Sequence, residues 1–228
     1  MRLAKPMIDL GLSTNMLEPM VEFWEHEIGL RLDHVLPVRR GQKQYRFDAA
    51  GSVIKVNHHR DPLPDAAFSG YRELLIAKPE LKRSRRLIDP DGNRITLVPA
   101  AFAQFDQIAV RLHVKSIEAH RAFYTNALGF SEISVAEGVG FRAGNSLLLL
   151  DQKLDVARNP GFEGKGWRYM TLQVFRVDDA HSLALLAGAR EAMAPTTLGT
   201  TARISMILDP DGNWIELSQR ASIVGSLD

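Results

Sequence analysis

The stretch DPDGNWIEL at residues 209–217 has a near-copy, DPDGNRITL, at residues 89–97. In each copy Asp, Pro and Gly stand at the first, second and fourth positions, which suits a type I turn. Strand-forming residues flank both turns. Each copy is therefore predicted to be a strand–turn–strand. The copies differ at one position that matters for chemistry, because Glu216 stands where the first copy has Thr96.

The repeat extends well beyond the turns. EFWEHEIGL at residues 22–30 matches AFYTNALGF at 122–130, and both segments read as amphipathic helix ends followed by a glycine C-cap. GYRELL at 70–75 resembles GWRYMT at 166–171. The second half is longer between this strand and the turn, and the added length is predicted to form a capped helix over 179–187. The first half has only a short connector there.

The sequence is therefore organised as an internal repeat. Two modules are expected, at residues 1–100 and 105–220, with a seam near 99–104 and without a second helix in the first module. For the second half, the predicted order is a strand (107–114), a helix (117–128), three strands (about 130–151), a strand (168–177), a helix (179–187) and further strands to Glu216.

Composition narrows the class of protein. The 228 residues are 45% apolar, with a formal net charge of +1 and no cysteine. The charge balance gives no reason to expect a nucleic-acid partner, and thiolate chemistry is excluded. Residues 1–6 contain no apolar stretch of the kind found in secretory leaders, so secretion is not expected. No apolar run is long enough to predict a membrane-spanning helix. A cytoplasmic protein that acts on a small molecule is the expectation.

The ordered landmarks resemble the vicinal oxygen chelate superfamily, which includes glyoxalase I, extradiol dioxygenases and bleomycin resistance proteins. The resemblance covers nearly the whole chain. It implies an α+β fold of tandem βαβββ units that form two curled mixed sheets. It also implies metal ligands, usually His, Gln or Glu, at the start of the first strand, at the start of the fifth, and after the final turn. Carried over residue by residue, these positions fall on Asp9, Glu73 and Thr96 in the first half and on Gln107, Tyr169 and Glu216 in the second.

Neither half holds a complete set of ligands, so a site would combine the halves. The two combinations are Asp9 with Tyr169 and Glu216, or Gln107 with Glu73. The first is the better site, because two carboxylates and a phenol can hold a hard divalent ion or transfer a proton. The resemblance thus implies a divalent metal (Fe, Mn, Ni, Zn or Mg), with Glu216 and Tyr169 as catalytic groups. The alternative is that these residues have no functional role, the carboxylates being charges at strand ends and Tyr169 a packing residue.

Several departures from the family pattern argue against its best-known activities. The fourth-strand carboxylate of glyoxalases falls near Lys55 and Leu148, and neither can serve. The tyrosine of extradiol dioxygenases falls on Met206, and LGTT at 198–201 holds no histidine. An ordinary glyoxalase I or extradiol dioxygenase is therefore not expected.

Two functions remain open at this point. The first is a small-molecule isomerase, lyase or oxygenase with Glu216 as metal ligand or general base. The second is a metal-free protein that sequesters a planar ligand, with Trp167, Trp214, Phe141 and Phe162 as apolar walls. A homodimer is a further expectation, because paired modules with open sheet edges often associate.

Overall fold

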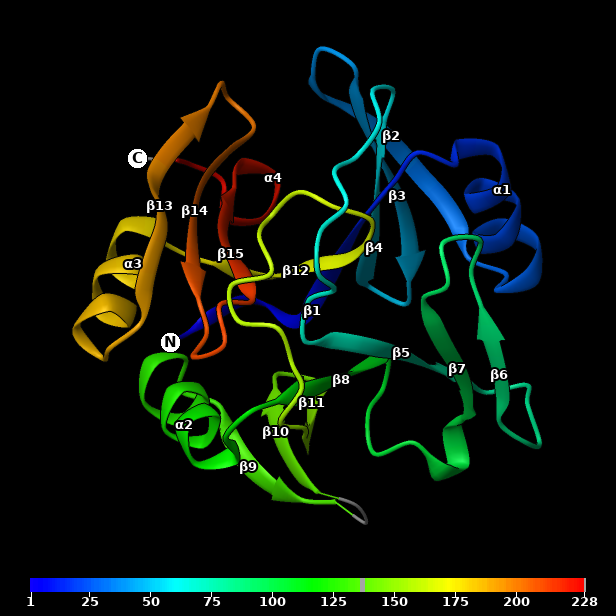
Figure 1. Ribbon diagram of the computed structural model, residues 1–228. Helices are drawn as coiled ribbons and strands as arrows, with labels where there is room; N and C mark the ends of the chain where they lie inside the picture. The colour runs from blue at the N-terminus through cyan, green and yellow to red at the C-terminus, as the bar shows by residue number, and fades with distance from the viewer. Residues whose placement is uncertain (136–137, 228) are drawn as a thin grey trace.

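Two mixed β-sheets form the body of the protein in a computed structural model, which describes residues 1–135 and 138–227 (Figure 1). The first is eight-stranded, in the order β13 (Arg190–Leu198), β14 (Ala202–Leu208), β15 (Trp214–Arg220), β12 (Gly166–Val174), β1 (Leu3–Thr14), β4 (Ser52–His59), β3 (Gln42–Ala49), β2 (Arg31–Arg39). The second is seven-stranded, in the order β6 (Arg85–Ile88), β7 (Arg94–Pro99), β5 (Tyr71–Lys78), β8 (Ile108–Val114), β11 (Ser146–Gln152), β10 (Val139–Ala143), β9 (Ser131–Ser134).

Helices lie on the outer flanks of the sheets, with α1 and α3 at opposite ends of the eight-stranded sheet (Figure 1). No helix of the described residues is long and apolar enough to span a membrane. The helical segments are α1 (Leu17–Glu22) with the π-helical turn η1 (Phe23–Glu27), the 3₁₀ turn η2 (Ala100–Phe102), α2 (Ile117–Ala122) with the π-helical turn η3 (Phe123–Ala127), α3 (Val177–Leu186) and α4 (Ala221–Val224).

The α+β class and the two mixed sheets predicted from the sequence are confirmed. The helix expected near 179–187 is α3, and β5 is followed by β6 without an intervening helix, as predicted for the shortened first half. Gly29 and Gly129 have φ values of 71° and 70°, the left-handed conformation expected of a glycine C-cap. The repeat thus predicts both the shared plan and its main asymmetry.

Each sheet contains strands from both sequence halves. Strands β1–β4 join β12–β15, and strands β8–β11 join β5–β7. The central contact of the eight-stranded sheet is the antiparallel pair β1–β12, in which Asp9 lies opposite Thr171 and Gly11 opposite Tyr169. The seam near residues 99–104 therefore separates two sequence repeats, whereas the sheets cross it.

The duplicated turns dock on the opposite half of the chain. In each turn the last Asn donates its side-chain N–H to the first Asp, at 2.7 Å for Asn93 and 2.8 Å for Asn213. The Oδ1 of Asn213 then accepts a hydrogen bond from Gly70 N at 2.5 Å, and the Oδ1 of Asn93 accepts one from Trp167 N at 3.3 Å. Each turn thus holds the start of the matching strand in the other half, which explains why both motifs occur twice.

The alternation of side chains along a strand determines which residues lie on each face of the eight-stranded sheet. Along β1, Ile8, Leu10 and Leu12 are fully buried and belong to the main hydrophobic core. Because successive side chains point to opposite faces, Asp9 and Ser13 lie on the other face, and both are buried. The face opposite the apolar core is therefore built from polar side chains, and this face carries the candidate site.

Candidate functional site

Buried polar side chains from five strands share one face of the eight-stranded sheet, and nine of them form the candidate site. We call this set the polar face, and its members are Asp9 (β1), Gln44 and Arg46 (β3), Lys55 and Asn57 (β4), Tyr169, Thr171 and Gln173 (β12), and Glu216 (β15). These residues are far apart in the sequence, since the first lies on β1 and the last on β15. The pairing of β1 with β12 brings the strands of the two sequence halves together in one sheet. Buried polar groups are costly unless they are paired or serve a ligand.

Lys55 lies at the centre of the polar face and bridges the two sequence halves. Its Nζ donates to Thr171 Oγ1 at 2.6 Å and to Glu216 Oε1 at 3.1 Å. The Lys55 and Glu216 side chains are only 3% and 11% exposed, so this ion pair is shielded from water. Burial lowers the pKa of Lys55, and the nearby carboxylates of Glu216 and Asp9 oppose that shift. The ammonium is therefore held by its anionic neighbours.

Asp9 is the second carboxylate of the polar face, and both of its oxygens are engaged. Oδ1 accepts hydrogen bonds from Lys5 Nζ at 2.5 Å and from Val53 N at 2.9 Å. Oδ2 accepts one from Gln173 Nε2 at 3.3 Å. This carboxylate acts as a structural anchor between β1, β4 and β12 and as a negative neighbour of Lys55.

Tyr169 extends the network toward β3 and β4. Its hydroxyl lies 3.2 Å from both Gln44 Nε2 and Asn57 Nδ2. Burial raises the pKa of Tyr169, and the charge of Glu216 adds to the effect, so the group stays a neutral phenol at ordinary pH. Arg46 Nη1 donates to Gln44 Oε1 at 2.7 Å, whereas Arg46 Nε is buried without a hydrogen-bond acceptor in the described residues.

Positive charge exceeds negative charge around the polar face. Arg220, at the end of β15, feels the charges of Arg46, Glu216 and Asp9, and its pKa is lowered by burial and by Arg46. Four cations thus surround two carboxylates, namely Lys5, Arg46, Lys55 and Arg220 around Asp9 and Glu216. An anion would be attracted to this surface.

The segment between β11 and β12 covers one end of the polar face. The ring of Phe162 packs against Tyr169 and Trp214 at centroid distances of 5.4 and 5.0 Å. Glu163, the next residue, forms an ion pair of 2.9 Å with Arg39 on β2. A pocket of about 210 Å³ opens beside this contact and is lined by residues that include Gln42, Arg39 and Glu163. Gln42 lies on the same strand face as Gln44, so the pocket adjoins the polar face.

The seven-stranded sheet holds the other predicted residues but differs in character. Glu73 accepts hydrogen bonds from Thr96 Oγ1 at 2.6 Å and from Arg111 Nε at 3.1 Å. Gln107 lies just before β8, its Oε1 buried without a partner, and no hydrogen bond in the described residues joins it to Glu73. The apolar cluster that contains Ala109 and Leu75 occupies the strand positions between them.

The strand register allows the residues of the two sheets to be compared position by position. Leu75 lies opposite Ala109 and Thr96 in the seven-stranded sheet, just as Thr171 lies opposite Asp9 and Glu216 in the eight-stranded sheet. Ala109 and Leu75 pack with further apolar residues of this sheet, namely Phe105, Leu147 and Leu149. The seven-stranded sheet is therefore apolar at these two positions, whereas Glu73, Thr96 and Arg111 form a part-buried polar network on the same face.

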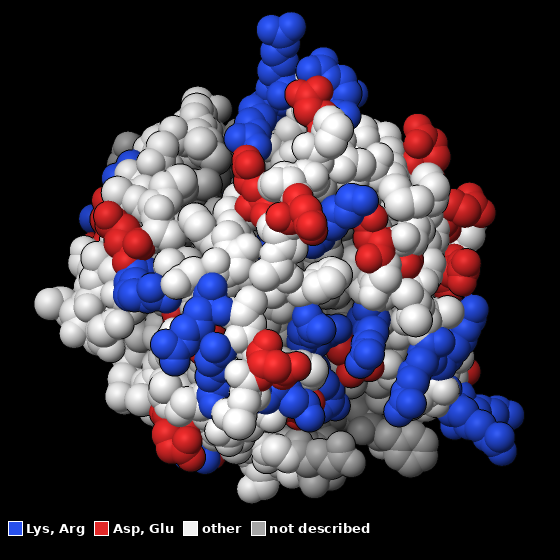
Figure 2. Space-filling view, in the orientation of Figure 1, with Lys and Arg blue, Asp and Glu red and all other residues white. Residues whose placement is uncertain are grey.

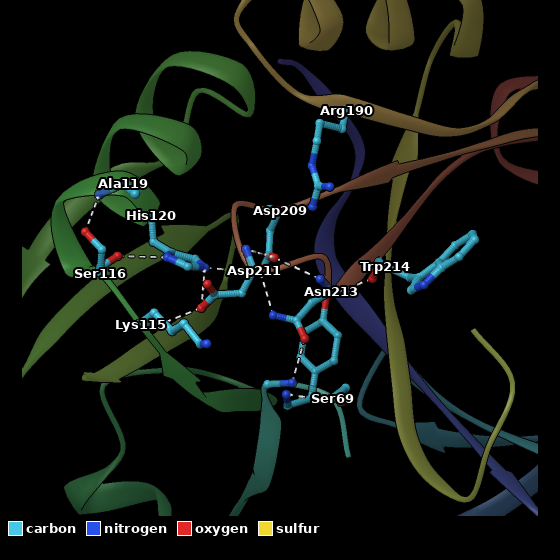
Figure 3. Close-up of polar contacts among 12 residues, drawn as sticks. Ser69, Lys115, Ser116, Ala119, His120, Arg190, Asp209, Asp211, Asn213 and Trp214 are labelled. Atoms are coloured by element: carbon cyan, nitrogen blue, oxygen red, sulfur yellow. Dashed lines mark hydrogen bonds and ion pairs between the residues drawn. The ribbon is translucent and has the colours of Figure 1, made fainter. Parts of the chain in front are cut away.

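A second polar cluster surrounds the turn at residues 209–213 (Figure 3). His120 on α2 directs Nε2 toward Asp209 and Asp211, at 3.4 and 3.7 Å, and its Nδ1 lies 2.8 Å from Ser116 O. Burial alone would lower the pKa of His120, but the two carboxylates outweigh burial and raise it. This cluster joins α2 to the β14–β15 turn, and we assign it a structural role.

The structure places the site residues predicted from the sequence in two separate groups. Asp9, Tyr169 and Glu216 lie on one face of one sheet. Glu73 lies on the other sheet and Gln107 just before its strand β8, with no hydrogen bond between the two in the described part of the chain. Sequence reasoning missed the amides and cations that fill the face, and it set Lys55 aside as unable to bind a metal. The available signal was the alternation in β4, where Lys55 and Asn57 alternate with the buried apolar residues Ile54 and Val56.

The fold, the repeat and the composite site define a class of protein built from paired βαβββ units. The model of the Glyoxalase/Bleomycin resistance protein/Dioxygenase superfamily matches residues 104–217, half of the chain. The chain belongs to this superfamily.

Solved structures resemble the whole chain. Glyoxalase I from Zea mays has a TM-score of 0.76 at 16% identity, covering 96% of this chain and 95% of its own. A putative dioxygenase from Bacillus subtilis subsp. subtilis str. 168 has a TM-score of 0.67 at 11% identity, covering 93% and 84%. At these identities the likeness shows the fold. No curated protein matches the sequence.

The divalent metal implied by the family does not suit the polar face. Among the described residues, no group of three or more His, Asp or Glu side chains could hold a metal ion. Both oxygens of Asp9 already accept hydrogen bonds from protein donors, and the Lys55 ammonium lies 3.1 Å from Glu216 Oε1. A divalent ion bound by Glu216 would face that ammonium and be repelled by it.

Proposed function

We propose that the protein binds a small, negatively charged, oxygenated molecule at the polar face and removes a proton from it with Glu216. The observation that supports this most directly is the excess of cations around Asp9 and Glu216, two of which, Lys55 and Arg46, are buried on the face opposite the apolar core. Membership of a superfamily that includes enzymes agrees with a catalytic role without selecting the reaction.

Glu216 has the features expected of a proton acceptor. Its Oε1 accepts from Lys55, and no hydrogen bond in the described residues engages its Oε2. Removing a proton from a carbon next to a carbonyl or carboxylate leaves negative charge on an oxygen of the ligand. Lys55 and Arg46 would stabilise that charge, since fixed cations in a dry site act strongly on developing anions. Tyr169 would position the ligand as a neutral hydrogen-bonding phenol.

The proton-transfer step can be tested without knowledge of the complete reaction. Short carboxylic acids with an oxygen on the adjacent carbon would first be screened for a rise in melting temperature. Those that bind would be incubated with the protein in D₂O, and loss of the proton signal adjacent to the carbonyl would be followed by NMR. The wild type is expected to catalyse exchange, and Glu216→Gln is expected to bind the same acids without catalysing it. Equal exchange by both would refute the role of Glu216.

Sequestration is the second candidate function, and the cover over the polar face favours it. Phe162 packs on Tyr169 and Trp214, and the Arg39–Glu163 ion pair closes the same segment onto β2. A protein that only stores its ligand would bind it tightly behind this cover. Binding without any exchange in the wild type would favour this function.

A cytoplasmic location and a homodimer remain predictions. Strands β2, β6, β9 and β13 form open sheet edges, which can pair with a second copy. Light scattering coupled to size-exclusion chromatography would measure the mass in solution, and a mass near 25.4 kDa would contradict the dimer.

A further inference from the structure

We infer that the Lys55 ammonium takes the place of a metal ion in this protein and that the ligand it binds is a short carboxylate with a second oxygen on the neighbouring carbon. This inference rests on the proposed function in that it concerns the same polar face. It adds the chemical class of the ligand and the group that replaces the metal.

Unused hydrogen-bonding capacity supports the role of Lys55. An ammonium carries three N–H donors, and two of them are taken by Thr171 Oγ1 and Glu216 Oε1. The third has no hydrogen-bond acceptor among the described residues, although the side chain is 3% exposed and Nζ lies 5.3 Å from the centroid of the Tyr169 ring. A buried donor without an acceptor is costly, so this position is suited to an oxygen of a ligand. Lys55 thus offers what a metal with one open position would offer.

Arg46 supplies the second contact. It lies directly opposite Lys55 in the antiparallel pair β3–β4, which places the two side chains side by side on the polar face. Its Nε is buried without an acceptor, and the residue is 5% exposed. A guanidinium is well suited to a carboxylate because its planar N–H donors match the two oxygens.

Two adjacent cationic groups therefore favour a ligand with two adjacent oxygen functions. The carboxylate would contact Arg46, and the oxygen of the next carbon would accept the third proton of Lys55. The excess of cations disfavours a neutral ligand of the same shape, and the buried Oε1 of Gln173, also without a donor, could accept a hydroxyl proton. Short 2-oxo and 2-hydroxy acids meet these requirements.

Calorimetric titration of the whole protein with glyoxylate, pyruvate and lactate would test the ligand class, with neutral methylglyoxal as the shape-matched control. Binding of at least one acid is expected in the presence of EDTA, and methylglyoxal is expected to bind at least about tenfold more weakly. Lys55→Met should weaken acid binding by about tenfold or more. Lys43→Met, at an exposed position on the opposite face of β3, should leave it unchanged.

A gain-of-metal experiment tests the replacement directly. Lys55→Glu places a carboxylate beside Glu216 and near Asp9, and it is expected to take up Mn²⁺, Ni²⁺ or Zn²⁺ at one ion per chain. The ion should raise the melting temperature of this variant by several degrees, whereas the wild type should show no bound ion after gel filtration. Lys55→Gln, which adds no charge, provides a second variant if the Glu variant folds poorly without metal, and it should take up more ion than the wild type.

Several results would overturn the inference. The first is that none of the three acids binds, and the second is that EDTA abolishes their binding. The third is that Lys55→Met leaves acid binding unchanged. The fourth is that the wild type holds one ion tightly and that Lys55→Met does not change this. Failure of the proposed function would look different, because acids would bind through Lys55 while deuterium exchange stayed at the background rate.

Discussion

Removing Lys55 should destabilise the protein far more than removing its partner Glu216. Lys55→Met leaves the carboxylate of Glu216 buried beside Thr171 and without its cation. Glu216→Gln leaves a lysine that keeps its bond to Thr171 and that can lose its proton, since burial already lowers its pKa. The asymmetry follows from the partners that remain, because Lys55 keeps Thr171 and the nearby charge of Asp9, whereas Glu216 loses its only side-chain hydrogen bond among the described residues.

The structure sets the magnitudes. Both side chains are nearly buried and 3.1 Å apart, so breaking the pair from the lysine side should cost about 3–5 kcal/mol. That is a large share of the roughly 5–15 kcal/mol that stabilises a typical domain. Glu216→Gln should cost about 1–3 kcal/mol. The double variant should cost less than the sum of the two, with a coupling of about 2 kcal/mol.

Urea unfolding at pH 7 of the wild type, both single variants and the double variant would measure this coupling, with coincident fluorescence and circular dichroism transitions as the test of two-state behaviour. Lys43→Met is the matched control and should shift stability by no more than about 0.5 kcal/mol. A coupling below about 0.5 kcal/mol would place the pair in the class of solvent-screened surface bridges and refute the reasoning.

Three further predictions concern other parts of the fold. The pKa of His120 is raised in the folded state, so its stabilising contribution is complete below about pH 6.5 and is lost as the pH rises through the pKa of the folded protein. The urea concentration at the unfolding midpoint should therefore fall from pH 6 to pH 9 in the wild type, and it should fall less in His120→Gln. Asn213→Ala removes the acceptor of the buried Gly70 N–H and should cost about 1–3 kcal/mol in urea unfolding; no loss would contradict the docking role. A Cβ at Gly11 would collide with the ring of Tyr169, so Gly11→Ala should lower the melting temperature, and a concurrent Tyr169→Ala should remove that added loss.

Much of the fold could be predicted because its signals are local. The turn at residues 209–213 and its copy at 89–93 can be predicted from their own residues, since Asp, Pro, Gly and Asn each fix a part of the turn. The α3 helix follows from a capped amphipathic stretch of ordinary length. The pairing of strands from opposite halves is different, because nothing in the sequence of β1 specifies β12 as its neighbour. That choice depends on long-range packing.

The candidate site was only partly predictable, for the same reason. Asp9, Tyr169 and Glu216 could be singled out one at a time, and the structure places them on a common face. Lys55 was considered only as a metal ligand and was set aside, because a lysine cannot replace a carboxylate in that role. Its importance depends on the charge of Glu216, which lies two intervening strands away and in the other half of the sequence.

The two sheets provide an internal comparison that supports a use of the polar face beyond folding. At two matching positions the seven-stranded sheet carries Ala109 and Leu75 where the eight-stranded sheet carries Asp9 and Thr171. These apolar residues pack in a cluster with Phe105, so the fold does not require polar groups at those two positions, although Glu73 and Arg111 form a part-buried ion pair elsewhere on the same face. Burying an ammonium, a guanidinium and two carboxylates in their place costs stability that packing would otherwise supply. A ligand that uses the free donors of that face would offset this cost each time it binds.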